Sequence, residues 1–61
     1  MFGIGYYDPA TNTVTDLKRP HHNFGSAKST AFKMQNHPAF SNRTVVVIDY
    51  SVVPNRYYLT K

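Results

Sequence analysis

The side chains best suited to metal binding and proton transfer are three histidines, two of them adjacent. His21 and His22 precede Asn23, and His37 follows Asn36. Such a set would suit a small metal-dependent nuclease, in which a hairpin and a helix present the ligands and a general base. A three-histidine zinc site is chemically sound, but this spacing does not support one. We therefore expect ordinary loop histidines, with no metal and no cofactor.

Carboxylates and nucleophiles are too few to suggest catalysis. The sequence has three acidic residues, Asp8, Asp16 and Asp49, and no cysteine. Asp8 suits a turn and Asp16 the exposed side of a short edge strand. Asp49 follows an apolar strand, where an ion pair with Arg43 or Arg56 would explain it. A thin core is also a poor scaffold for a water-excluding pocket, so we expect no enzymatic activity and no small-molecule ligand.

Basic residues outnumber acidic ones, seven to three, which gives a net charge of +4. Together with exposed tyrosines they would suit single-stranded nucleic acid, where bases stack on rings and cations follow phosphates. The candidate phosphate contacts are Lys28, Lys33, Arg43 and Arg56. The cations are dispersed, however, and no nucleic-acid-binding motif accompanies them. Nucleic-acid binding is therefore the alternative prediction.

A chain of 61 residues allows one small domain, residues 1–61. Such a chain buries roughly 60% of the surface that its unfolded form exposes, so its core is thin. No window approaches the roughly 18–20 apolar residues needed to span a bilayer. The N-terminus lacks a basic start and a continuous apolar run, so we expect no signal peptide, no membrane association and a cytoplasmic location.

Two hairpins should flank one helix. Alternation predicts a strand over about 2–7, followed by an Asp-Pro-containing turn in which Asn12 tolerates the left-handed conformation. The chain then returns as a strand over about 13–18. Apolar residues at helical spacing predict a helix over about 27–36, with Ser26 as its N-cap. The apolar stripe of this helix comprises Phe24, Ala27, Ala31 and Met34.

The second hairpin comprises strands over about 44–50 and 56–60. The run Val45 to Ile48 is apolar on both faces, which is typical of a central strand. The predicted fold class is therefore α+β, in the order ββαββ. It has a four-stranded, mainly antiparallel sheet and one helix packed on one face. We expect the strand order 2-1-3-4.

The sheet face without a helix is the predicted binding surface. If Phe2, Ile4 and Tyr6 point towards the helix, Gly3, Gly5 and Tyr7 point away from it. Tyrosines from neighbouring strands would cover the glycines in one interpretation; a partner would cover the face in the other. The candidate interface residues are Gly3, Gly5, Tyr7, Val45, Val47 and Tyr58.

These observations favour a small protein that acts by binding. The expected partner is another protein or a second copy of the chain, contacted through the helix-free face or an exposed strand edge. Nucleic-acid binding and a structural role in a larger assembly are the alternatives.

Overall fold

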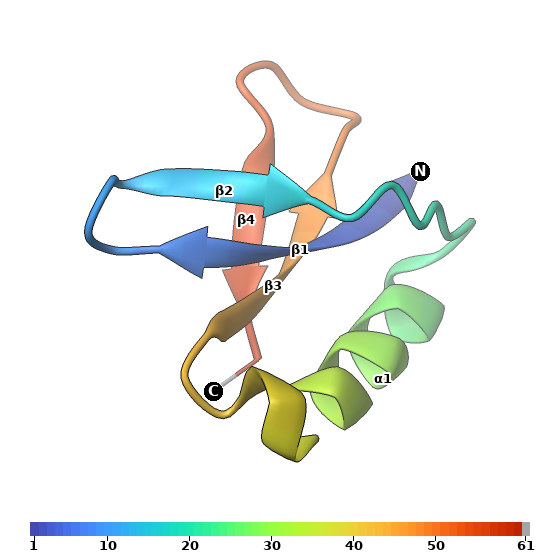
Figure 1. The fold of residues 1–61 in the computed structure, drawn as a ribbon. Helices are drawn as coiled ribbons and strands as arrows, with labels where there is room; N and C mark the ends of the chain where they lie inside the picture. Colours follow the sequence, from blue (N-terminus) through green and yellow to red (C-terminus); the bar gives the residue numbers. More distant parts are fainter. Residues whose placement is uncertain (61) are drawn as a thin grey trace.

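The computed structural model describes residues 1–60, in which two hairpins flank a helix (Figure 1). The elements, in chain order, are β1 (Phe2–Asp8), β2 (Thr13–Asp16), α1 (Phe24–Gln35), the short 3-10 helix η1 (Pro38–Phe40), β3 (Thr44–Asp49) and β4 (Arg56–Leu59). The α+β class and the ββαββ order predicted from the sequence are confirmed.

The four strands form one antiparallel sheet in the order β2-β1-β3-β4, as predicted. The central pairing of β1 with β3 places Ile4 opposite Val47 and Tyr6 opposite Val45. Strands β1 and β2 cross β3 and β4 at a steep angle, so the sheet is strongly twisted (Figure 1). Asn12 closes the first hairpin with a φ of 55°, the left-handed conformation expected for it.

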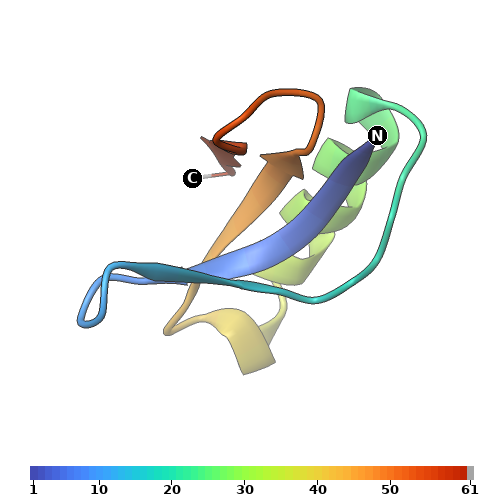
Figure 2. The ribbon, with the colours of Figure 1, turned by 90° about the horizontal axis from the view of Figure 1, so that it is seen from above.

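The core lies between α1 and the two central strands. Ala27 and Ala31 are fully buried and pack with Ile4, Val45 and Val47. Small alanine side chains let the helix approach the sheet closely, while Phe24 and Met34 fill the wider gaps beside it. Figure 2 shows α1 on one side of β1 and β3 only. The predicted helical stripe is thus confirmed.

The helix begins three residues before the predicted start. Its N-cap is Asn23, whose side-chain oxygen accepts a hydrogen bond from the Ser26 backbone N–H (2.7 Å). The prediction of Ser26 as the cap was wrong; its hydroxyl instead bonds the His21 ring (3.0 Å). Asparagine is at least as good an N-cap as serine, so the earlier residue caps the helix.

Strands β2 and β3 end earlier than predicted because an aspartate turns the chain at each end. Asp16 accepts a hydrogen bond from the backbone N–H of Lys18 (2.7 Å), which adopts a φ of 58°. Asp49 accepts bonds from the backbone N–H and the hydroxyl of Ser51. Both are local side-chain turns that compete with strand pairing.

Gln35 connects the end of the helix to the start of β3. Its amide oxygen accepts a hydrogen bond from the Val45 backbone N–H (2.7 Å). Its amide nitrogen donates to the carbonyl oxygens of Arg43 (2.8 Å) and Phe40 (3.3 Å). One side chain therefore pairs backbone groups that the sheet does not, and it fixes the loop on which Arg43 lies.

Candidate functional site

The two faces of the sheet differ in what covers them. Val45 and Val47 are fully buried against the helix, and Tyr58 packs beside them with its ring 5.1 Å from that of Phe24. Their assignment to the helix-free face was wrong. The reason is register: Tyr6 and Ile4 face the helix, and residues directly opposite on an antiparallel strand share a face.

The two glycines do lie on the helix-free face, but neither is accessible. A methyl group added at Gly3 would lie 2.2 Å from the Tyr50 hydroxyl oxygen, so this ring covers Gly3. A methyl group at Gly5 would lie 2.3 Å from the Thr15 carbonyl oxygen. The chain itself therefore covers this half of the face, and Gly3 and Gly5 cannot contact a partner directly.

Tyr50 is held over Gly3 by a hydrogen bond from its hydroxyl group to Asp16 on β2. Desolvation, together with this bond and the charge of Asp16, raises the pKa of Tyr50 to about 12. The neutral hydroxyl is therefore favoured in the folded protein. This ring tethers the end of β3 to β2 across the face of β1.

The other half of the helix-free face is an open apolar groove of about 480 Å³. We call it the β4 groove; it is lined by Tyr7, Asn12, Val14, Val46, Tyr57 and Leu59. Of the predicted interface residues, only Tyr7 lies here. Val46 forms the buried floor, whereas Tyr57 and Leu59 are 48% and 65% exposed. With Tyr6 paired to Val45, counting along the neighbouring strands would have placed these residues on the helix-free face.

Strand β4 forms one edge of the sheet in residues 1–60, and its outer backbone groups pair with no described strand. Its apolar side chains Tyr57 and Leu59 face the groove, and only its first residue, Arg56, is charged. Sheet edges are commonly protected by lysine, proline or bulges. Positions 57–59 carry no lysine or proline, so β4 presents a row of hydrogen-bonding groups beside an apolar groove.

The four candidate phosphate contacts do not form one patch. Lys28 and Lys33 lie on the outer surface of α1, where they flank Phe32, which is 54% exposed. Arg43 immediately precedes β3, whereas Arg56 lies opposite Asp49 at the other end of that strand. The structure therefore separates these cations into three places.

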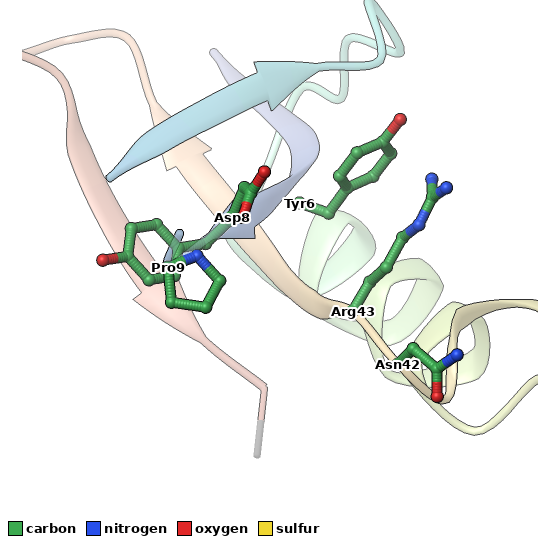
Figure 3. A pocket seen from close by; sticks show the side chains of 6 residues that line it. Tyr6, Asp8, Pro9, Asn42 and Arg43 are labelled. Carbon is green, nitrogen blue, oxygen red and sulfur yellow. The ribbon is translucent and has the colours of Figure 1, made fainter. Parts of the chain in front are cut away.

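Arg43 lines a second hollow, of about 400 Å³, where the β1–β3 pairing ends (Figure 3). We call it the end cleft; its walls are Tyr6, Tyr7, Asp8, Pro9, Asn42 and Arg43. The Arg43 guanidinium carbon is 4.6 Å from the centre of the Tyr6 ring, a cation–π contact. Asp8, on the opposite wall, accepts a hydrogen bond from the Ala10 backbone N–H (2.9 Å).

Two of the three histidines make local contacts. His21 pairs with Phe2 in an isolated bridge, and the His37 ring accepts a hydrogen bond from the Ala39 backbone N–H (3.1 Å). Asp49 lies opposite Arg56, one of the two arginines expected near it, and its carboxylate also accepts hydrogen bonds within its own turn. The bonds from Ser51, with a smaller contribution from the charge of Arg56, lower the pKa of Asp49. Over residues 1–60, no three histidine or acidic side chains gather as a metal site. No helix within these residues is long and apolar enough to cross a bilayer.

Comparison with protein families, with characterised proteins and with solved structures found no match. The two hollows and the exposed edge of β4 are therefore the candidate binding sites.

Proposed function

We propose that this protein is a non-enzymatic binding module that takes up an extended segment of another protein. The segment would pair with the outer edge of β4 and insert apolar side chains into the β4 groove. The observation that carries the proposal is the exposure of Tyr57 and Leu59 beside this groove, on a strand with an unpaired edge. Strand addition of this kind derives affinity from backbone hydrogen bonds and specificity from alternate side chains.

The size of the groove favours an extended segment over a second copy of the chain. A stable interface buries about 800 Å² on each partner. That area is about a fifth of the 4229 Å² surface described here. The β4 groove has only two strongly exposed apolar side chains, which is little for a dimer of globular copies. One extended strand would need only the β4 groove for its side chains and the edge of β4 for its backbone hydrogen bonds.

The net charge of the protein indicates which kind of segment it would bind. The chain carries a net charge of +4, so two copies repel each other and an acidic segment is attracted. Each aspartate side chain already accepts a hydrogen bond from a nearby N–H or hydroxyl group: Asp8, Asp16 and Asp49. The partner expected here is therefore a segment with apolar residues at alternate positions and acidic residues between or beside them.

The cytoplasmic location expected from the sequence stays a prediction.

Selection from a displayed random-peptide library tests the proposal. The folded protein should enrich peptides with alternating apolar residues and a net negative charge. Leu59→Asp should abolish binding of these peptides. Val53→Asp is the matched control, because Val53 is 97% exposed, lies outside the groove and undergoes the same change of charge.

Two results would contradict the proposal. One is equal loss of peptide binding in both variants, which would indicate an effect of charge alone. The other is a wild-type dimer in sedimentation experiments that Leu59→Asp dissociates, which would identify a second copy as the occupant of the groove.

A further inference from the structure

The end cleft has a different chemistry from the β4 groove. It opens where β1 and β3 diverge, beyond the last pair, Tyr7 and Thr44. Its volume of about 400 Å³ is within the range of small-molecule sites, roughly 300–1,000 Å³. One wall supplies hydrogen-bond donors from Asn42 and Arg43, and the opposite wall supplies a carboxylate, Asp8. Aromatic and proline rings provide the remaining surface.

Arg43 is held in a position from which it can bind an anion. Its guanidinium rests 4.6 Å from the centre of the Tyr6 ring, and the two side chains extend side by side in Figure 3. Its backbone carbonyl is fixed by the Gln35 amide (2.8 Å). The contact between the guanidinium and the aromatic ring does not use the N–H donors of the arginine. These donors can therefore still bind two oxygens of a phosphate or carboxylate.

The opposite wall limits the choice of ligand. A small inorganic anion would be repelled by Asp8 and would leave the rings without contact. An apolar ligand would cover Arg43 and Asp8 without hydrogen bonds, which is unfavourable. The matching ligand has an anionic group at one end and a flat ring with N–H donors at the other. Nucleotides combine these features, and their bases stack on aromatic rings and on guanidinium planes.

We infer that the end cleft binds a nucleotide, with its phosphate on Arg43 and the N–H groups of its base towards Asp8. Tyr7 and Pro9 line the cleft beside Asp8 and provide apolar surface for the base. The same chemistry is offered by a free mononucleotide and by one residue of a single-stranded nucleic acid. Only Arg43, among the four cations considered for phosphate binding, lies in a cleft with tyrosines.

The test is a titration of the ¹⁵N-labelled protein, followed by amide chemical shifts, with GMP, guanosine, inorganic phosphate and a six-nucleotide single strand as separate probes. GMP should shift the amides of residues 6–8 and 42–43 and bind more tightly than either guanosine or phosphate. Tighter binding of the oligonucleotide through the same amides would identify nucleic acid as the source. Tighter binding of GMP would identify the free nucleotide.

A matched pair of variants separates the site from general charge. Arg43→Gln should weaken GMP binding by about tenfold or more, because it removes a charge-assisted contact. Arg56→Gln removes the same charge at the far end of β3 and should change the affinity less than about twofold. Both spectra should keep the dispersion of the folded wild type. Equal losses in the two variants, equal binding of guanosine and GMP, or no binding at millimolar GMP would overturn the inference.

Discussion

Replacing Gly3 with alanine tests how the helix-free face is covered. The new methyl group would lie 2.2 Å from the Tyr50 hydroxyl oxygen and 2.7 Å from the adjacent ring carbon. These atoms are the far end of a rotatable side chain, so the ring moves aside and the backbone stays in place. The hydrogen bond from Tyr50 to Asp16 is then lost.

The expected size of the effect comes from two opposing contributions. A hydrogen bond to a charged group stabilises a protein by about 1.5–3 kcal/mol, and incomplete burial of this pair favours the lower value. Alanine in a strand recovers about 0.5–1 kcal/mol relative to glycine, because the unfolded chain has less conformational freedom. Gly3→Ala should therefore destabilise the fold by about 1 kcal/mol, which lowers the melting temperature by roughly 4–8 °C.

The assay is urea and thermal unfolding followed by circular dichroism, in two backgrounds. In Tyr50→Ala, where the covering ring is absent, Gly3→Ala should become stabilising by about 0.5–1 kcal/mol. Gly5→Ala should be more damaging in both backgrounds, because its methyl group meets the Thr15 carbonyl oxygen, a backbone atom that cannot rotate away. The same destabilisation by Gly3→Ala with and without the Tyr50 ring would show that this ring does not cover Gly3.

Four further substitutions test the fold. Gln35→Ala should destabilise it by about 1–3 kcal/mol, since the Val45 N–H loses its partner; unchanged urea midpoints would contradict this role. Asn23→Ala should cost about 1 kcal/mol in the same assay and Ser26→Ala less, because only the first caps the helix; the reverse order would contradict the cap assignment. Tyr50→Phe should reduce the loss of folding stability at alkaline pH, because folding of the wild type favours the neutral form of the Tyr50 hydroxyl. That contribution is complete below a pH of about 10 and is lost as pH rises through about 12; a constant difference between wild type and variant from pH 9 to 12 would count against it.

The elements and their order could be predicted because local patterns determine them. Alternation identified the first strand, and a continuous apolar run identified the third. The Ala27 and Ala31 spacing identified the buried helical face, and Asn12 closed the first turn as expected. The helix start was misplaced because two capping residues, Asn23 and Ser26, lie three positions apart. Local composition does not show which of the two is the N-cap. The hydrogen bond from the Ser26 backbone N–H to the Asn23 side chain identifies Asn23 as the cap.

The binding surface was only half predictable, because it depends on register between distant strands. A fully apolar strand such as β3 carries no alternation, so its residues do not reveal which of them faces the helix. Val45 was therefore placed on the wrong face and Leu59 was overlooked. The end cleft depends on residues 37 positions apart, Tyr6 and Arg43, and no local pattern brings them together.

In the proposed complex, a partner segment pairs with β4 and fills the groove beside it. Its most direct test is amide hydrogen exchange of the ¹⁵N-labelled protein, with and without the peptide selected by display. Binding should slow exchange at outward-facing amides of residues 56–59 and shift the signals of Tyr7 and Val14, while Phe32 on the outer surface of α1 stays unchanged. Protection confined to α1, with β4 exchanging as it does in the free protein, would contradict it.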